Sequence, residues 1–260
     1  MGVLEPDGAS AAVVAAAGAL GLPVHGWRGL AGMSGRTWAA GEHILRLVEP
    51  ARVDAEVAAA AAAAAVVPVA EPLARVDLPE TAALLLPRLP GRPAGELDGV
   101  DPGRAAARGR ACARAQLAIN GVPAPPGLPP PRPVPGGHPV PGDRLLHLDL
   151  HPFNVLVDDD DQVSGVIDWA NAAAGPPALD RARTGTILNL DPLAIRLAAD
   201  PAWAALAAGW ASAADLGGLP APALAWACRY MLADLAHRYR PDQLTHVRAA
   251  LRGAEPAAGG

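Results

Sequence analysis

The sequence LLHLDLHPFNVLVDDDDQVSGVIDW, from Leu145 to Trp169, sets polar residues of catalytic type between apolar runs. His147, Asp149 and Asn154 fall in the pattern H-x-D-x-x-x-x-N, and Asp168 closes the next apolar run. Apolar runs of this length, bounded by turn residues, are typical of buried β-strands. Buried strand ends rarely carry acidic side chains without a role for them. The stretch therefore predicts a functional site built where strands end.

Two apolar segments inside this stretch, residues 155–157 and 163–167, predict the strands of a β-hairpin, with residues 158–162 as its turn. A hairpin brings its two outer ends side by side, so we expect Asn154 to lie next to Asp168. The four consecutive acids at 158–161 lack the alternating ligand spacing and the glycine of an EF-hand loop. They predict a solvated turn and no calcium site.

The spacing of Asp149 and Asn154 is that of the kinase catalytic loop H-R-D-x-x-x-x-N, and Asp168 stands where a kinase carries the Asp of its D-F-G. Phosphoryl transfer needs a group that orients the attacking hydroxyl, and metal ions on the phosphates. Mg²⁺ prefers hard oxygen ligands, which an amide carbonyl and a carboxylate supply. We therefore assign Asp149 as the catalytic residue, and Asn154 and Asp168 as Mg²⁺ ligands.

A second interpretation stays open at this point, because His147, Asp149 and His151 alternate as H-x-D-x-H. On a β-strand these three side chains would share one face and could bind the metal of a hydrolase. Pro152 would interrupt such a strand, and Asn154 would have no part in the site.

The residues before this stretch predict a β-rich region with one main helix. A first helix is expected over residues 9–20, a glycine-rich segment with two short strands ends at residue 48, and an alanine-rich helix begins at Pro50. Two more strands are expected over residues 67–76 and 81–87. We place a domain boundary after them, with residues 1–88 as a nucleotide-binding lobe and 89–260 as a catalytic and substrate-binding lobe.

The remaining segments predict a mostly helical region. Helices are expected over residues 101–120 and 224–238, and around the apolar stripe Trp203, Leu206, Ala207 and Trp210. Residues 122–143 are dense in Pro and Gly and predict a long connecting loop, and residues 171–180 predict a second loop. The last eight residues are expected to be disordered.

Composition narrows the class of protein. The chain has 260 residues, no lysine, and a net charge of −5, which argues against a nucleic-acid partner. Without lysine there is no Walker A motif and no Schiff-base chemistry. The two cysteines, Cys112 and Cys228, are expected to be reduced core residues. No apolar run reaches the roughly 18 residues that a membrane span needs, and we expect no signal peptide and a cytoplasmic monomer or weak dimer.

The motif HLDLHPFNVLV, followed by GVIDW and by GPPALD, closely resembles the aminoglycoside phosphotransferase family, which includes choline kinase-like relatives. The resemblance is strong over residues 145–180 and looser over residues 20–144. It implies an α+β, two-lobed protein-kinase-like fold, with a small β-rich N-terminal lobe that has one main helix and a mostly helical C-terminal lobe. It also implies a kinase that uses ATP (or GTP) and Mg²⁺ to phosphorylate a hydroxyl of a small molecule.

The resemblance also suggests roles for residues outside the central stretch. Arg46 takes the place of the β3 lysine, with Glu56 as its helix partner, and residues 84–89 would form the hinge that contacts adenine. His147 and Asp180 would brace the catalytic loop. The residues that would bind the nucleotide cofactor are Gly29, Gly32, Gly35, Arg46, Glu56, Leu86 and Leu89.

Three departures from the family pattern affect the function. The first is the pair Leu148 and Phe153, which stand where relatives often carry glycine, and the second is Arg46, which replaces a lysine. The third is the helix before the Pro-rich loop, which ends QLAIN at residues 116–120 where relatives tend to carry Leu-His. An arginine is longer and planar and is not a neutral exchange at a phosphate. These changes keep a nucleotide-binding pseudokinase or regulatory module open as an alternative. An aminoglycoside acceptor is not assigned, because a polycation needs an acidic pocket and the C-terminal part mixes Arg and Asp about equally.

Overall fold

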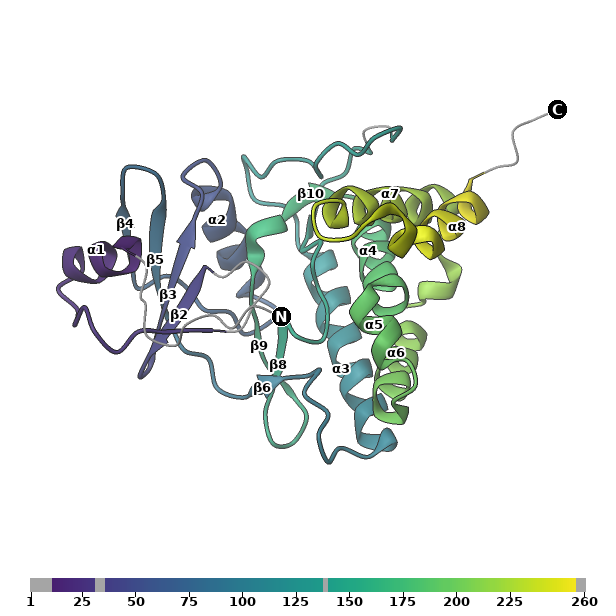
Figure 1. Cartoon of the computed structure of the whole chain (residues 1–260), viewed down its shortest axis with the longest axis horizontal. Helices are drawn as coiled ribbons and strands as arrows, with labels where there is room; N and C mark the ends of the chain where they lie inside the picture. The colour runs from purple at the N-terminus through teal and green to yellow at the C-terminus, as the bar shows by residue number, and fades with distance from the viewer. Residues whose placement is uncertain (1–10, 31–35, 138–139, 256–260) are drawn as a thin grey trace.

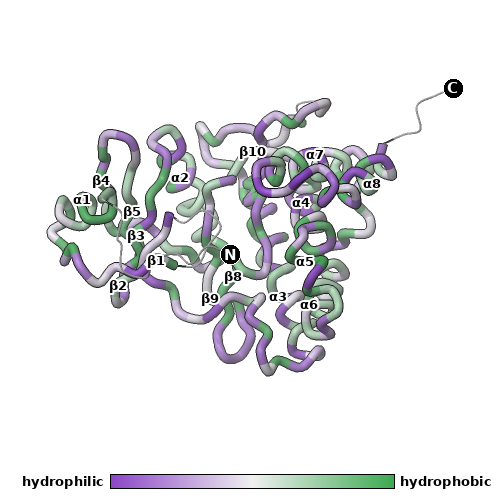
Figure 2. The backbone as a smooth tube through the Cα atoms, viewed as in Figure 1, coloured by the Kyte–Doolittle hydropathy of each residue, from purple (hydrophilic) through white to green (hydrophobic). Residues whose placement is uncertain are grey.

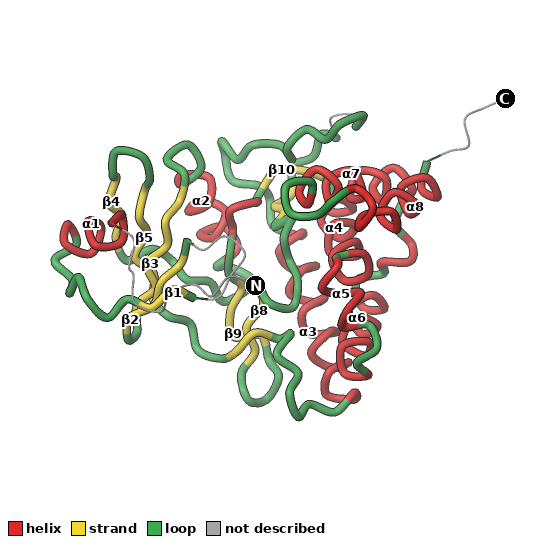
Figure 3. Tube along the Cα trace, viewed as in Figure 1, coloured by secondary structure: helices red, strands yellow, loops and turns green. Residues whose placement is uncertain are grey.

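The computed structural model describes residues 11–30, 36–137 and 140–255. Figure 1 shows an N-terminal region built on a β-sheet beside a C-terminal region built from helices, and Figure 3 shows the strands and helices largely segregated in this way. The expected α+β architecture, with a β-rich N-terminal region and a mostly helical C-terminal region, is confirmed.

The N-terminal sheet has five strands in the order β1-β2-β3-β5-β4, and every neighbouring pair is antiparallel. Register decides what each face carries, because side chains alternate along a strand. Arg46 pairs with Leu84, and Ile44 pairs with Leu86, so these four side chains share one face. The strands are β1 (Arg28–Gly29), β2 (Thr37–Ala40), β3 (His43–Val48), β4 (Ala74–Asp77) and β5 (Ala82–Pro87).

The two faces of this sheet are covered by different helices. α1 (Ala11–Ala19) packs its small apolar side chains against Leu45, Leu47 and Leu85 on one face. α2 (Val53–Ala63) begins against Leu84 on the other face, and its first turn carries Glu56. Glu56 therefore lies over the face of the sheet that carries Arg46.

The C-terminal region is organised around the crossing of two helices. At this crossing Gly109 of α3 faces the backbone of α6, and Gly209 of α6 faces the backbone of α3. A Cβ added at Gly109 would lie 2.0 Å from the carbonyl oxygen of Leu206, and one at Gly209 would lie 2.3 Å from that of Ala106. The helices are α3 (Pro102–Gly121), α4 (Pro177–Leu190), α5 (Pro192–Leu197), α6 (Pro201–Ala213), α7 (Ala221–Leu235) and α8 (Thr245–Ala254).

Two small sheets join the regions. The predicted hairpin is confirmed as β8 (Val155–Val157) and β9 (Val163–Val166), and β6 (Arg92–Pro93) pairs with β8. The second sheet pairs β7 (Arg144–Leu146) with β10 (Ala173–Gly175). Both sheets therefore end close to the residues between β7 and β8, which carry the H-x-D-x-x-x-x-N motif.

Some sequence-based boundaries were wrong. The strand expected over residues 67–76 forms only at β4, because its first part contains two prolines and contributes a single bridge from Val69 to Val166. The loop expected over residues 171–180 contains β10 and the first turn of α4. The helices expected over 101–120 and around Trp203 to Trp210 are confirmed as α3 and α6. Residues 256–260, part of the tail expected to be disordered, lie outside the described residues.

The acidic turn of the β8–β9 hairpin differs from the expected solvated turn in one residue. Figure 2 shows this turn as hydrophilic, and Asp159 and Asp160 are exposed. Asp161, however, is buried and receives hydrogen bonds from Arg104 and Arg108 of α3. The side chain of Arg108 is fully buried, so Asp161 supplies its counter-charge. The hydrogen bonds of Asp161 therefore hold the hairpin against α3.

Replacing Asp161 by Asn is expected to lower the free energy of unfolding by about 3 kcal/mol, because the buried Arg108 loses its counter-charge. Burial raises the pKa of Asp161, but the two arginines outweigh it and hold the pKa below its ordinary value. The contribution is therefore complete above about pH 4 and is lost as the pH falls further. Urea unfolding at pH 7 and pH 3 measures both effects. The exposed Asp160→Asn is the matched control, and equal stabilities of the two variants would contradict the assignment.

Two further expectations concern the whole chain. Cys112 and Cys228 are buried free thiols, and burial raises the pKa of Cys112 to about 12. In the part of the chain that the structure describes, no helix is both long and apolar enough to cross a membrane.

Candidate active site

The segment from His147 to Leu150 follows β7 and holds Asp149 at its centre. It is not a strand, because Leu148 has a φ of 60°, in the left-handed region. This conformation costs a leucine roughly 1–2 kcal/mol relative to a residue in the right-handed region. Burial offsets that cost, since the Leu148 side chain is 1% exposed and packs with Leu146 and Leu179. The leucine thus adopts the backbone conformation for which glycine is the usual residue.

Phe153, which also stands where relatives often carry glycine, points away from Asp149. Its ring stacks on Trp203 of α6, with centroids 6.2 Å apart and an interplanar angle of 24°. On its other side it lies against Gly95, where an added Cβ would come within 2.9 Å of the ring. The large side chain therefore fills space between α6 and the β6 segment and does not occupy the site.

Asp149, Asn154 and the segment before Asp168 are joined by hydrogen bonds. Asn154 Nδ2 donates to the carbonyl oxygen of Asp149 at 2.9 Å. The amide of Ile167 donates to the carbonyl oxygen of Asn154 at 3.0 Å, which continues the hairpin ladder by one residue. The predicted proximity of Asn154 and Asp168 is therefore confirmed by the backbone.

His147 contacts the backbone of both Asp149 and Ile167. Its Nε2 lies 3.0 Å from the carbonyl oxygen of Ile167, and its Nδ1 accepts from the amide of Asp149 at 3.3 Å. Because Nδ1 accepts, the proton is on Nε2 and can be donated to Ile167. The ring also packs on Trp169, with centroids 4.7 Å apart. Both nitrogens of His147 are thus used to hold backbone, which is the supporting part expected for it.

Arg46 connects the N-terminal sheet to Asp168. Its Nε donates to Glu56 Oε1 and its Nη2 to Asp168 Oδ1, both at 2.6 Å. Burial by itself lowers the pKa of Arg46, but the carboxylates of Asp168 and Glu56 outweigh it and raise that pKa. Burial raises the pKa of Glu56, whose Oε2 is buried without a hydrogen-bond partner among the described residues. The expected pairing of Arg46 with Glu56 is present, and Asp168 is a partner that the sequence did not suggest.

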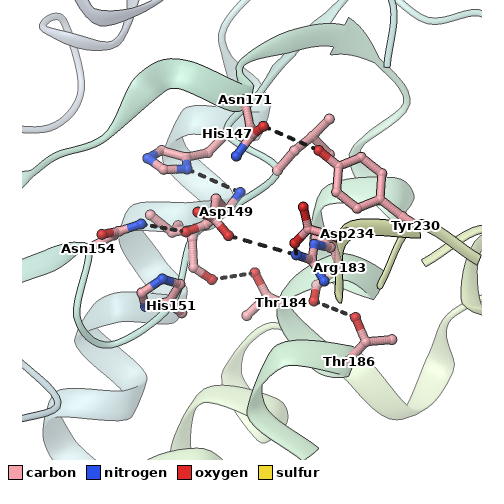
Figure 4. A network of polar contacts seen from close by, with 12 residues as sticks. His147, Asp149, His151, Asn154, Asn171, Arg183, Thr184, Thr186, Tyr230 and Asp234 are labelled. Carbon is pink, nitrogen blue, oxygen red and sulfur yellow. Dashed lines mark hydrogen bonds and ion pairs between the residues drawn. The ribbon is translucent and has the colours of Figure 1, made fainter. Parts of the chain in front are cut away.

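One face of α4 holds the catalytic segment. Asp180, Arg183 and Thr184 are spaced i, i+3 and i+4 and therefore point the same way. Asp180 Oδ1 accepts from the amide of Leu148 at 2.6 Å, and Thr184 Oγ1 donates to the carbonyl oxygen of Leu150 at 2.8 Å. Arg183 Nη2 lies 3.9 Å from Oδ1 of Asp149, the residue between Leu148 and Leu150 (Figure 4). Asp180 and Thr184 of one helix thus hold the backbone on either side of Asp149, and Arg183 of the same helix faces its carboxylate.

Asp180 is itself fixed from α3. Its Oδ2 accepts from Gln116 Nε2 at 3.2 Å and from Asn120 Nδ2 at 2.9 Å, and it is fully buried. Gln116 also donates to Thr184, so the supports of Leu148 and Leu150 are linked. This arrangement agrees with the bracing part expected for Asp180.

The residues on the expected nucleotide side fall into three groups. Leu86 shares the face of the sheet that carries Arg46, and Leu89 lies past the end of β5, where it contacts the position of Gly165 on β9. Gly29 is exposed on the edge strand β1. Gly32 and Gly35, also expected to contact the nucleotide, lie outside the described residues.

The geometry does not favour the hydrolase interpretation. His147, Asp149 and His151 do not lie on a strand, and His147 uses both nitrogens for backbone contacts. Within residues 11–30, 36–137 and 140–255, no three His, Cys, Asp or Glu side chains are grouped so that they could hold a metal ion. His151 Nδ1 accepts from the amide of Phe153, and burial lowers the pKa of His151.

The sequence interpretation missed a set of polar residues next to Asp149. Arg183 Nη2 donates to Asp234 Oδ2 at 2.9 Å, and Arg132 Nη2 donates to Asp234 Oδ1 at 3.1 Å. Both guanidinium groups lie over the ring of Tyr230. The Tyr230 hydroxyl donates to Asn171 at 3.3 Å (Figure 4). The helical spacing of Asp180, Arg183 and Thr184 could have identified Arg183. Nothing in the sequence connects Arg132 with Asp234.

Comparisons with known proteins agree with this geometry. The model of the phosphotransferase enzyme family matches residues 28–136 and 138–216, and the chain therefore belongs to that family. The match makes the chain a phosphotransferase, and neither the pseudokinase nor the hydrolase alternative is favoured. No curated protein sequence matches the chain.

Solved structures of similar fold are distant in sequence. An aminoglycoside 3′-phosphotransferase of type VIII has a TM-score of 0.55 at 17% identity, over 95% of this chain and 100% of the other. A variant of aminoglycoside 2′-phosphotransferase-IIIa, solved with GDP, has a TM-score of 0.54 at 15% identity, over 86% and 89%. Aminoglycoside phosphotransferase APH(3'')-Id from Streptomyces rimosus, solved with ADP and streptomycin, gives 0.50 at 16% identity, over 76% and 92%.

Proposed function

We propose that this protein transfers the γ-phosphoryl group of ATP or GTP, with Mg²⁺, to a hydroxyl group of a small molecule. One observation carries the proposal: Asp149, Asn154 and the residue before Asp168 are held in one hydrogen-bonded unit, and Asp168 in turn contacts Arg46. A base, two hard oxygen ligands and a cation are the groups that phosphoryl transfer requires from a protein.

Asp149 is the residue that accepts the proton of the attacking hydroxyl. Its carboxylate is a quarter exposed, and its one charged contact among the described residues is Arg183 at 3.9 Å. At that distance the guanidinium leaves the carboxylate oxygens free to accept a hydrogen bond from a bound alcohol. The backbone of Asp149 is held from both sides, by His147 and by Asn154, so the carboxylate is positioned before substrate binds.

Asn154 and Asp168 would hold the Mg²⁺. Asn154 uses its amide nitrogen to donate to Asp149, which leaves its carbonyl oxygen as the atom available to a metal ion. Asp168 has one carboxylate oxygen in contact with Arg46, and its side chain is 29% exposed. Both are hard oxygen donors of the kind that Mg²⁺ prefers, so the residues present fit the ion. When bound, Mg²⁺ would neutralise charge on the phosphates.

The nucleotide would lie against the face of the N-terminal sheet that carries Arg46 and Leu86. Arg46 supplies positive charge toward phosphate oxygens, and Glu56 holds its guanidinium in place. The stretch from Leu86 to Leu89 continues from β5 into the C-terminal region, as a hinge does. Some proteins of similar fold were solved with ADP or GDP, which supports nucleotide use. We extend the proposal to lobes at 1–88 and 89–260, and to a cytoplasmic monomer or weak dimer.

The test is a nucleotide-binding and turnover experiment on the whole chain. We expect ATP or GTP with Mg²⁺ to raise the melting temperature, because a ligand at 100 times its Kd stabilises the folded state by about 2.7 kcal/mol. We then expect phosphoryl transfer to at least one member of a broad panel of alcohols. Binding without transfer to any member would identify a nucleotide holder and contradict the proposal, and absence of both would contradict the site as a whole.

A further inference from the structure

One side of Asp149 is open to the acceptor. Asn154 and Asp168 occupy the side of Asp149 toward the N-terminal sheet, where the proposed phosphates and metal would lie. On the other side the Asp149 carboxylate faces Arg183 and Asp234 (Figure 4). A hydroxyl must therefore reach Asp149 along the surface made by α4, α7 and the Pro-rich loop.

The charges on this surface are not those that bind a polycation. Asp234, the carboxylate that shares Arg183 with Asp149, already has both of its oxygens paired with arginines, and the exposed Asp143 of the loop is paired with Arg144. Apart from the catalytic carboxylate, Arg132, Arg183 and Asp234 sum to a charge of +1. Apart from Asp149 itself, an amino-substituted acceptor would meet two guanidinium groups and a carboxylate, Asp234, whose oxygens are both already paired.

Arg132 is held in a defined place by the Pro-rich loop. Three residues before it, the carbonyl oxygen of Pro129 accepts from the amide of Ala174 on β10 at 2.8 Å. Three residues after it, the carbonyl oxygen of Pro135 accepts from Arg229 of α7 at 2.9 Å. Leu128 and Val134 of the loop are buried. The loop therefore positions Arg132 over the Tyr230 ring, and the guanidinium carbon of Arg132 lies 3.9 Å from the ring centroid.

Both arginines retain donors that the protein does not use. The Arg132 side chain is 43% exposed, and among the described residues only its Nη2 has a hydrogen-bond partner. Arg183 is 5% exposed at its side chain, and its Nε and Nη1 are buried without a partner in the described part of the chain. The guanidinium carbons of Arg132 and Arg183 lie 3.9 Å and 4.8 Å from the centroid of the Tyr230 ring, within the range of a cation–π interaction. An oxyanion is the ligand that a guanidinium with free donors recognises best.

We propose that Arg132, Arg183 and Tyr230 form the acceptor subsite, and that the acceptor is an alcohol carrying a carboxylate or phosphate group and not a polycation. The proposal rests on the function proposed above. Arg132 binds the anionic group directly, and Arg183 is a positioning residue that holds Asp234 and faces Asp149. The charge on the acceptor thus places its hydroxyl at the catalytic carboxylate.

Sets of alcohols matched in skeleton and different in charge test the proposal. Glucose, glucuronate and glucosamine form one set, and glycerol, glycerate, glycerol 3-phosphate and 3-amino-1,2-propanediol form another. We expect kcat/KM for phosphoryl transfer to be about tenfold higher for the anionic member than for the neutral one, because a hydrogen bond to a charged group contributes this much. The phosphate and carboxylate members of the second set separate the two kinds of oxyanion.

Variants assign the preference to Arg132. In Arg132→Gln we expect KM for anionic acceptors to rise about tenfold with kcat little changed, since the contact is made in both ground and transition states. KM for the nucleotide should stay the same. The control is Arg240→Gln, which removes an exposed arginine paired with Asp242 on the surface before α8.

A binding measurement decides the question independently of turnover. In protein saturated with ADP and Mg²⁺, the side-chain NMR signal of Arg132, assigned by its loss in Arg132→Gln, should shift on titration with glycerate or glycerol 3-phosphate and not with the amino alcohol. Transfer that favours neutral or cationic acceptors, or an unchanged preference in Arg132→Gln, overturns the inference and leaves the proposed kinase function standing. If no alcohol is phosphorylated, the proposed kinase function is contradicted instead. If, in addition, the Arg132 signal shifts with neither anionic alcohol, the inference is overturned as well.

Discussion

The Asp149→Asn variant is expected to lose phosphoryl transfer, with kcat lowered by about 10²- to 10⁴-fold, the usual contribution of a general base. Asparagine has the shape of aspartate but cannot accept the proton of the attacking hydroxyl. The backbone contacts of Asp149 with His147 and Asn154 do not involve its carboxylate and remain possible. Steady-state kinetics with saturating nucleotide and acceptor measure the loss.

The fold and nucleotide binding should be unaffected in this variant. Arg183 keeps its closer partner Asp234 at 2.9 Å, so removal of the charge at 3.9 Å leaves no buried cation without a counter-ion. We expect the melting temperature and the nucleotide Kd to match those of the unsubstituted protein. Asp159→Asn, the same change on the exposed hairpin turn, is the control and should retain full activity. A kcat for Asp149→Asn within a few-fold of the control would remove Asp149 from the catalytic role.

The second large effect is expected for Arg46→Met, which should lower the free energy of unfolding by about 3–5 kcal/mol. The substitution leaves the Glu56 carboxylate, 8% exposed, without a counter-charge, and frees Asp168 from its contact with the sheet. Because Arg46 is also the cation that faces the phosphates, kcat/KM for the nucleotide should fall in the same variant. Urea unfolding and nucleotide titration measure the two effects separately.

A double variant separates the lost ion pair from lost packing. Replacing Arg46 by Met together with Glu56 by Leu removes both buried charges, and we expect most of the lost stability to return, as it does when buried pairs are exchanged for apolar residues. A double variant as unstable as Arg46→Met alone would show that the side chain of Arg46 stabilises by packing. Activity should not return, since the cation is still missing.

The pH dependence of Arg46→Met follows from Glu56. Burial already holds the pKa of Glu56 above its ordinary value, and loss of Arg46 removes the largest opposing effect. Because the pKa of Glu56 is higher in the folded protein than in the unfolded chain, its ionised carboxylate destabilises the folded state above that pKa. This destabilisation disappears as the pH falls through the folded-state pKa toward the unfolded-state value of about 4.3. The difference in stability between Arg46→Met and the unsubstituted protein should therefore shrink as the pH is lowered from 8. A difference that does not change with pH would exclude the Glu56 charge as its cause.

The departures at Leu148 and Phe153 show where sequence interpretation was limited. From the sequence, both residues suggest a restricted loop and a nucleotide holder without activity. In the structure Leu148 adopts the left-handed conformation, and burial of its side chain offsets the free-energy cost of that conformation. Phe153 packs on Trp203, away from Asp149. Whether a large side chain obstructs a loop depends on the neighbours that surround it, which lie on other elements of the fold.

The sequence by itself determined the parts of the protein whose causes are local. The apolar runs and the turn of the β8–β9 hairpin fix which residues pair, so the sequence alone placed Asn154 beside Asp168. Its alanine-rich and capped segments likewise predicted α2 and α3. The spacing of Asp149 and Asn154 was sufficient to suggest the chemistry.

Only the tertiary structure decided which distant charges meet. Arg46 and Asp168 are 122 positions apart, and Arg132 and Asp234 are 102 apart, so no periodicity or motif relates them. Asp161 was expected to be solvated, yet it lies against α3 and neutralises Arg108. A charged side chain is stable in a partly buried site only where an opposite charge is brought to it. That pairing is set by the packing of helices and sheets, and it determines both the cation at the proposed phosphate site and the charge of the proposed acceptor subsite.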